Sequence, residues 1–481
     1  MRFTKTEHYD KISNNSSEII EGVSMIRHYL DIVERGHTGK SVTKEEWDFE
    51  YILMKTRDLV EKYDLSWDPE NITPVDDDLV DRIYKAGKEL LLSTGVYNIS
   101  TNRIIHIDEE ELDEALENQP KELVMGEGKD ACTLYARDIE DRRRPIVWAG
   151  NPGAPTPEYL FKACVKSWAQ EPVVDLITCG SLVDVDGYKV RTREASELLA
   201  VRRELMYLRQ VLKEVGRPGM GMLAAESSVS EVGDLSVVHP DYLRSCDAHL
   251  VAMFNELIID RDNMVRAASS IDYGMRNASL ATVMVGGLAG DAPGAAVVQV
   301  ASFLAANIVC RADYHLCHPI HIKHVSTSTR GCMWLQSVVC QAFARNAPSI
   351  IVCDIYPKSG ALTKELLYEV AANALAITVS GGHLEGVGSA DGSVPNGTGL
   401  EARLMGEVGR AATKQGLTRE EANKMIMKLL DKYEHVFEME GGNPGRPFDE
   451  AYDIKTIRPV DQWLDMYYEV KDYLREIGLD I

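Results

Sequence analysis

The spacing of apolar residues divides the chain into three regions. In residues 1–140 the chain is charged, and its apolar positions follow a helical period at Trp47, Tyr51, Ile52, Met54, Leu59 and Val60. An extended pair of segments is expected around residues 95–107, and an acidic helix near residues 109–118. These patterns predict an N-terminal helical region.

From about Pro145, short apolar runs alternate with amphipathic stretches, as in successive βα units. The eight runs are residues 145–150, 173–180, 219–226, 249–255, 281–287, 318–324, 349–356 and 375–382. We therefore predict an α/β fold, a (β/α)8 TIM barrel over residues 141–398. An open doubly wound sheet is the alternative, but no G-x-G-x-x-G turn follows the first run.

The third region, residues 399–481, returns to charged helical periodicity and ends in an amphipathic stretch over residues 461–477. We predict a C-terminal helical segment that completes or caps the barrel. The Gly- and Ser-rich residues 380–399 are interpreted as the loop after the eighth strand.

Charge narrows the classes of ligand. Among 481 residues, 75 acidic against 52 basic side chains give a formal net charge of −23, which would repel a nucleic-acid backbone. An acidic surface could favour a cationic substrate, or it could simply keep the protein soluble. We expect no nucleic-acid partner.

The nine cysteines are scattered and mostly embedded in apolar runs, so they are interpreted as buried thiols and not as a disulfide framework. The sequence has no basic and apolar N-terminal leader and no uninterrupted apolar stretch of about 18 residues. We therefore expect a cytoplasmic protein with no membrane contact.

Barrel enzymes carry their active sites at the carboxyl ends of the strands, so residues there are candidates for chemistry. These are Trp148, Asn151, Glu226, Ser227, Ser228, Asn255, Glu256, Gly286, Gly287, His321, Lys323, Asp354, Tyr356, Ser380 and His383. Glu226 ends the third run and Asp354 interrupts the seventh. Such carboxylates suit substrate or proton handling, with a salt bridge or a helix cap as the alternative.

Two further patterns are weaker. His315, Cys317 and Cys353 make a conceivable zinc set, but the spacing lacks a close Cys or His pair, so we expect structural packing and no metal. The glycine-rich residues 216–221 look like a phosphate loop, yet they lack the G-K-[ST] ending and precede a strand. A tight turn is the favoured interpretation.

Residues 216–230, Gly-Arg-Pro-Gly-Met-Gly-Met-Leu-Ala-Ala-Glu-Ser-Ser-Val-Ser, resemble the pyrrolysine-bearing strand of monomethylamine methyltransferases. In that family a methylated amine gives its methyl group to a corrinoid protein. Leu223 stands where pyrrolysine would be. Further stretches agree in order and spacing: residues 255–257 with Asp260, 286–290, 315–316, 319–322, 326–330, 356–357 and 399–408. The resemblance covers the chain from about residue 40 to its end.

The departures from the family pattern form a set. In the family, two glutamates and a glutamine surround the pyrrolysine, and their positions correspond here to Leu250, Leu280 and Asp354. A single leucine for pyrrolysine could be an expression artefact, since that residue is read from a stop codon. Loss of the acidic neighbours as well indicates natural divergence, because a buried carboxylate without its partner is costly.

The resemblance implies a corrinoid-dependent methyltransferase that lacks pyrrolysine and acts on a small N-methylated, quaternary amine. It implies a cognate corrinoid protein as partner, no tightly bound cofactor of the chain's own, and a homo-oligomer. Glu226 and Asp354 are the expected catalytic residues. The expected substrate-binding residues are Leu223, Leu250, Leu280, Asn255, Glu256, His321, Tyr356 and Trp148. Zinc-dependent methyl transfer from a thiol or an alcohol, or a non-catalytic homologue that binds a corrinoid protein, are the alternatives.

Overall fold

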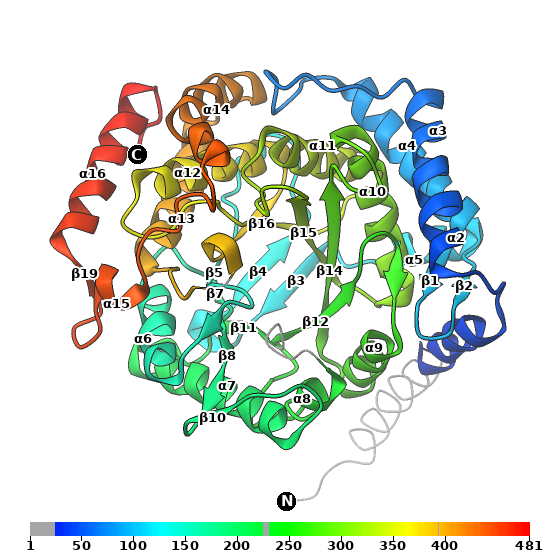
Figure 1. The fold of residues 1–481 in the computed structure, drawn as a ribbon, viewed down its shortest axis with the longest axis horizontal. Helices are drawn as coiled ribbons and strands as arrows, with labels where there is room; N and C mark the ends of the chain where they lie inside the picture. Colours follow the sequence, from blue (N-terminus) through cyan, green and yellow to red (C-terminus); the bar gives the residue numbers. More distant parts are fainter. Residues whose placement is uncertain (1–24, 225–229, 393) are drawn as a thin grey trace, which may run out of the picture.

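The structure, a computed structural model, describes residues 25–224, 230–392 and 394–481, and its centre is a closed barrel (Figure 1). Each strand pairs in parallel with the next along the chain, and the last returns to the first. The eight strands are β5 (Val147–Ala149), β7 (Leu176–Ile177), β11 (Gly221–Ala224), β12 (Ala248–Met253), β14 (Arg276–Val285), β15 (Tyr314–His321), β16 (Ile351–Ile355) and β17 (His383–Gly386). The predicted TIM barrel is confirmed.

Seven of the eight predicted runs overlap these strands, although β12, β14 and β15 begin before the runs that predicted them. The eighth prediction was wrong. Residues 375–382 belong mostly to helix α12 (Lys364–Ser380), which ends at Gly381 in a left-handed conformation with φ of 100°. The strand is β17, inside the segment interpreted as a loop.

Helices surround the barrel (Figure 1). They are α6 (Glu158–Ala169), α7 (Ala195–Glu214), α8 (Glu231–Leu235), α9 (Arg261–Tyr273), α10 (Ala292–Val309), α11 (Arg330–Asn346), α12 and α13 (Gly399–Gln415). Since α13 packs against α12, α6 and the strands β17 and β5, it closes the ring. Within the described part of the chain, only α10 has the length and apolar character of a membrane span, and it is buried throughout as a core helix.

The N-terminal region forms a layer outside α10 and α11 (Figure 1). Its helices are a helix over residues 25–38, α2 (Lys44–Glu46), the π-helix η1 (Trp47–Met54), α3 (Lys55–Lys62), α4 (Asp77–Thr94) and α5 (Glu109–Asn118). Strands β1 (Val96–Asn98) and β2 (Arg103–Ile105) form a small sheet with β13 (Ile258–Ile259), which comes from the loop after β12. This sheet ties the layer to the rim of the barrel.

A hairpin closes the amino-terminal end of the barrel. Its strands are β3 (Glu122–Met125) and β4 (Cys132–Tyr135), and its turn is bonded to the starts of the barrel strands through Gly126 N to Cys246 O at 2.9 Å and Glu127 N to Gly219 O at 2.8 Å. Leu123, Met125 and Leu134 of the hairpin pack into the barrel interior. The interior can therefore open only at the carboxyl ends of the strands.

The C-terminal helices α14 (Arg419–Tyr433) and α16 (Asp461–Glu476) pack on the outside of α12 (Figure 1). Short elements complete the described chain: β6 (Pro155–Thr156), β8 (Ser181–Leu182), β9 (Asp184–Val185), β10 (Tyr188–Lys189), α15 (Phe448–Ala451), β18 (Tyr452–Asp453), β19 (Arg458–Pro459), η2 (Gly128–Asp130), η3 (Ala390–Gly392) and η4 (Glu434–Glu438).

Candidate active site

The lower part of the barrel interior is filled with apolar side chains. Because side chains alternate between the two faces of a strand, every second residue of each strand points into the lumen. The buried interior residues are Leu123, Met125, Leu134, Ile146, Trp148, Leu176, Leu223, Ala248, Leu250, Ala278, Tyr314, Leu316, Ile350 and Val352. Trp148 stacks on Tyr314 with the ring centroids 5.5 Å apart. The floor of the lumen is therefore closed.

Leu223, Leu250 and Leu280 lie on three neighbouring strands and all join this interior cluster. Leu223 is the register partner of Ala248 on β12, and Leu280 is the register partner of Ala252 on the same strand. Leu223 and Leu250 are buried, whereas Leu280 is only partly buried and packs against the cluster. The structure thus brings the three predicted leucines together as one apolar wall of the lumen.

The opposite wall is acidic. Asp354 lies two residues beyond Val352 on β16, so it points into the same lumen. Its register partner on β17 is Glu385, whose own partner on β5 is Trp148. Both carboxylates are buried, with Asp354 4% and Glu385 0% exposed. Register partners on neighbouring strands lie about 4.8 Å apart, so these two carboxylates are adjacent.

Glu385 was missed in the sequence because the segment that carries it had been interpreted as a loop. A correct eighth strand would have placed this carboxylate among the lumen residues by alternation.

His318 is a second residue that the sequence reading did not single out. It lies two residues beyond Leu316 on β15 and faces the lumen beside Asp354. Its Nδ1 is 2.6 Å from Asp354 Oδ2, and its ring meets the Tyr356 ring edge-on with centroids 5.5 Å apart. A carboxylate only accepts hydrogen bonds, so Nδ1–H of His318 is the donor. Among the described residues, Asp354 Oδ1 has no hydrogen-bond partner.

Glu256 lies at the carboxyl end of β12, but it is held beneath the N-terminal layer. Its Oε1 accepts from Met284 N at 3.3 Å, and its backbone carbonyl accepts from Trp47 Nε1 at 3.0 Å. Burial raises the pKa of Glu256 to about 7. The neighbouring Asn255 is exposed at the rim. A substrate-binding role for these two residues stays a prediction.

His321 and Tyr356 lie at the rim on neighbouring strands. The ring centroids of His321 and His324 are 4.6 Å apart, and burial lowers the pKa of His321. The Tyr356 carbonyl accepts hydrogen bonds from Thr327 N and Ser326 Oγ, both at 2.9 Å. Of the two, Tyr356 is the closer to the candidate site, because its ring contacts His318.

Several candidates lie elsewhere. Glu226, Ser227 and Ser228 lie outside the described residues. Ser380 belongs to α12, where its hydroxyl bonds to Ser337 at 2.8 Å. His383 begins β17 at the barrel floor: its Nδ1 accepts from Ile146 N at 2.9 Å, and burial lowers its pKa to about 3. The expected position of Ser380 and His383 at the mouth was therefore wrong.

The conceivable zinc ligands point away from the lumen toward the helices. His315 stacks on Phe303 with centroids 4.7 Å apart, and its Nδ1 is 2.8 Å from Ser279 Oγ. Cys353 Sγ lies 3.4 Å from Cys340 Sγ, and burial raises the pKa of the Cys353 and Cys317 thiols. Across the described ranges, no three His, Cys, Asp or Glu side chains are arranged to hold a metal ion.

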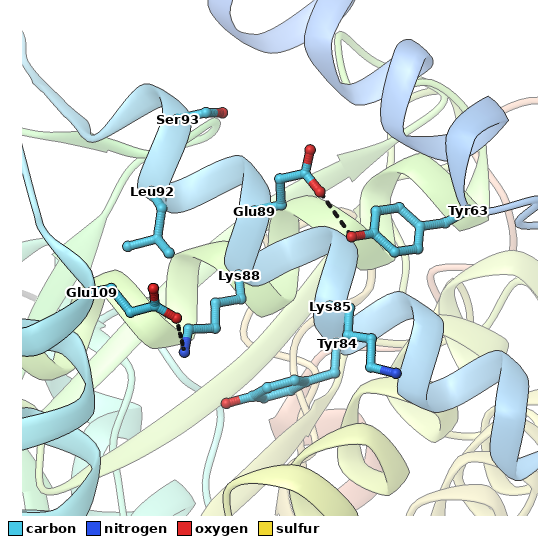
Figure 2. Close-up of a pocket in the computed structure, with 8 residues that line it drawn as sticks. All are labelled: Tyr63, Tyr84, Lys85, Lys88, Glu89, Leu92, Ser93 and Glu109. Carbon is cyan, nitrogen blue, oxygen red and sulfur yellow. Dashed lines mark hydrogen bonds and ion pairs between the residues drawn. The ribbon is translucent and has the colours of Figure 1, made fainter.

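The molecule also has a surface pocket of about 460 Å³ on the outer face of α4 (Figure 2). Figure 2 shows two of its polar pairs, Lys88 with Glu109 at 3.0 Å and Tyr63 with Glu89 at 2.8 Å. The other side of α4 packs on α10 and α11, so this pocket lies outside the barrel and away from the strand ends. The barrel lumen remains the candidate active site.

Comparison with known proteins shows the family of this chain. The family model of monomethylamine methyltransferase MtmB matches residues 28–479. The chain belongs to the monomethylamine methyltransferase family. MtmB2 of Methanosarcina acetivorans is 34% identical over 457 residues, which cover 93% of this chain and 97% of the relative. MtmB1 of Methanosarcina barkeri is 34% identical over 455 residues with the same coverage.

Solved structures of the family have the same fold. The crystal structure of the Methanosarcina barkeri monomethylamine methyltransferase MtmB matches with a TM-score of 0.91 and 32% identity, covering 94% of this chain and 98% of that one. The hydroxylamine complex of MtmB matches to the same extent. This member of the monomethylamine methyltransferase family is therefore a methyltransferase with a TIM-barrel fold.

Proposed function

We propose that this methyltransferase moves a methyl group from a small quaternary amine to a corrinoid carried by a cognate partner protein. The observation that supports the proposal best is the two-sided lumen, with Asp354 and Glu385 on one wall and the three leucines on the other. A quaternary ammonium is charged, yet its surface consists of methyl groups. It therefore suits carboxylates on one side and apolar side chains on the other.

The chemistry of the leaving group favours the same substrate class. When a quaternary ammonium loses a methyl group, a neutral tertiary amine leaves, and no proton transfer is needed. Such a donor does not require a covalent adduct to activate it. We infer that Leu223 occupies the position of the pyrrolysine in this family, and that Leu250 and Leu280 replace the acidic neighbours that an adduct would need.

The mouth of the barrel suits a partner that brings the methyl acceptor. Phe254, Ile322 and Val325 follow the ends of β12 and β15 and are 43%, 51% and 45% exposed. Exposed apolar side chains at a rim suit a contact surface. A reduced corrinoid supplies the nucleophile for the methyl group. The chain itself binds the donor, orients one methyl toward the mouth and excludes water from the lumen.

Among the predicted residues, we assign charge compensation to Asp354 and keep Glu226 as a proposed second carboxylate. Trp148 at the floor and Tyr356 at the rim would add cation–π contacts, which contribute about 0.5 to 2 kcal/mol each. We propose Asn255 and His321 as rim residues that frame the donor, and Glu256 as a buried residue that supports this part of the rim. We further propose that the protein acts in the cytoplasm as a homo-oligomer.

The test is methyl transfer to the cognate corrinoid protein, reduced to cobalt(I), followed by its absorbance. Quaternary amines, smaller methylamines, methyl thiols and methanol are supplied as donors in turn. Turnover with a quaternary amine supports the proposal. Turnover only with a thiol or an alcohol contradicts it, and stable complex formation without methyl transfer to any acceptor would indicate a non-catalytic homologue.

A further inference from the structure

We propose that His318 and Glu385 complete a cation-binding wall in the lumen, in which His318 acts as a positioning residue that orients Asp354 toward the ligand. The inference rests on the proposed function and names the residues that recognise the donor's positive charge. Its ligand class is a methylated ammonium ion.

The first step is the placement of the three side chains. His318, Asp354 and Glu385 lie on the neighbouring strands β15, β16 and β17. His318 is two residues beyond Leu316 and Asp354 is two residues beyond Val352, so both face the lumen as these apolar residues do. Glu385 faces the lumen as the register partner of Asp354. His318 and Asp354 lie beyond the filled apolar floor, and Glu385 lies beside Asp354 as the register partner of Trp148. A ligand that enters from the mouth would therefore reach His318 and Asp354 first.

The second step is the charge of this wall. On the lumen faces of β15, β16 and β17 the ionisable side chains are Tyr314, His318, Asp354, Glu385 and His383. His383 is bonded to the backbone at the floor, and burial lowers its pKa to about 3, so it is neutral. Asp354 and Glu385 bring two carboxyl groups to the wall, and His318 brings its one remaining imidazole. A cation placed beside the two carboxyl groups would be attracted to their oxygens.

The third step is the hydrogen bond between His318 and Asp354. With Nδ1–H of His318 donating to Oδ2 at 2.6 Å, one carboxylate oxygen is fixed in place. The other, Oδ1, is buried and has no hydrogen-bond partner within the described ranges. A buried carboxylate oxygen without a partner is costly. A bound cation would lower this cost, and His318 decides which oxygen faces it.

The fourth step is the exposure of the side chains beside this wall, where β15 pairs with β14. Thr282 on β14 is the register partner of His318, and Leu280 is that of Leu316. Leu280, Thr282 and His318 are only partly buried, whereas Leu250 and Leu316 below them are buried. Solvent therefore reaches the side chains of β14 and β15 at this level, but not those below them. A methylated ammonium placed there would contact leucine methyls on one side and carboxylates on the other.

The experiment measures binding by isothermal titration calorimetry on the full chain without the corrinoid protein, using tetramethylammonium and its neutral analogue tert-butanol. The wild-type protein is expected to bind tetramethylammonium and to bind tert-butanol at least about tenfold more weakly. Asp354→Asn and Glu385→Gln are each expected to weaken tetramethylammonium binding about 10- to 100-fold and to leave tert-butanol unchanged.

His318 is tested with a matched pair of variants. His318→Asn places an amide N–H near the position of Nδ1, whereas His318→Phe keeps a ring but has no donor. We expect His318→Phe to lose about tenfold in tetramethylammonium affinity and His318→Asn to recover most of it. Equal loss in both variants, or no loss in either, would overturn the positioning role. Thermal melts identify any variant that fails to fold, and Glu385→Asp then replaces Glu385→Gln.

Measuring both binding and methyl transfer distinguishes the proposed cation site from the proposed function. If the wild-type protein binds tetramethylammonium with the expected variant pattern but transfers no methyl group, the cation site stands and the proposed function fails. If it binds tert-butanol as tightly as tetramethylammonium, the cation site is overturned, whatever the transfer assay shows.

Discussion

The carboxyl group of Glu256 accepts a hydrogen bond from the backbone N–H of Met284 at 3.3 Å, inside the rim where β12 and β14 meet the N-terminal layer. Its other oxygen has no hydrogen-bond partner among the residues that the structure describes. Burial raises the pKa of Glu256 from 4.5 to about 7. Ionisation of this group therefore opposes folding.

This group makes stability depend on pH in a definite direction. Below pH 4.5 the carboxyl is protonated in both the folded and the unfolded chain, and between pH 4.5 and 7 only the folded chain keeps its proton. Stability thus falls as pH rises through this window, by about 2 to 4 kcal/mol for this group. Urea unfolding should show that Glu256→Gln loses less stability between pH 5 and pH 8 than the wild type. The exposed Glu420→Gln is the control, and parallel curves for both variants would contradict the assignment.

Replacing leucine by alanine should have different effects at two positions of the apolar wall. Leu250 is 5% exposed inside the cluster, so Leu250→Ala should cost about 2 to 5 kcal/mol of unfolding free energy through the cavity it leaves. Leu280 is only partly buried and lies where the lumen opens, so Leu280→Ala should cost less than half as much. Its main effect should be a higher KM for the methyl donor. Denaturant unfolding and steady-state kinetics of both variants check this, and a larger stability loss for Leu280→Ala would be inconsistent with the lumen described above.

The cysteines are expected to be chemically inert in the folded protein. Seven of the nine are buried, and Cys132, one of the two partly exposed, has its pKa raised to about 12 by burial. Because the thiolate is the reactive form, a thiol reagent at pH 8 should modify the folded chain slowly and all nine residues only in guanidinium. Metal analysis of wild type and Cys317→Ser should give the same zinc content. Stoichiometric zinc that is lost in Cys317→Ser would support the thiol or alcohol alternative instead.

Most of the barrel could be predicted from the sequence because its strands are short apolar runs separated by amphipathic helices. The eighth strand could not be predicted in this way. The end of α12 is buried on all sides, so its residues 375–379 carry no helical period and look like a buried strand. The true strand β17 has the sequence His-Leu-Glu-Gly, with one large apolar residue. This error moved Glu385 into a loop and placed Ser380 and His383 at the mouth.

The acidic wall could not be predicted without knowing the register of the strands. Alternation along β15 puts His315 and Cys317 on one face and His318 on the other, but only the pairing with β14 and β16 shows which face is the lumen. His315 and Cys317, the conceivable metal ligands, lie on the face that packs against the helices. Asp354 was recognised because a carboxylate interrupted an apolar run. Its partner His318 came from a different strand, and no local pattern connects the two.

The most direct test of the central proposal is the ratio of kcat/KM for tetramethylammonium to that for monomethylamine, measured with the same reduced corrinoid protein. The structure of the lumen, with an acidic wall and an apolar wall, predicts a ratio well above one, and Asp354→Asn should lower kcat/KM for tetramethylammonium about 10- to 100-fold. A ratio below one, with monomethylamine the better donor, would contradict the account.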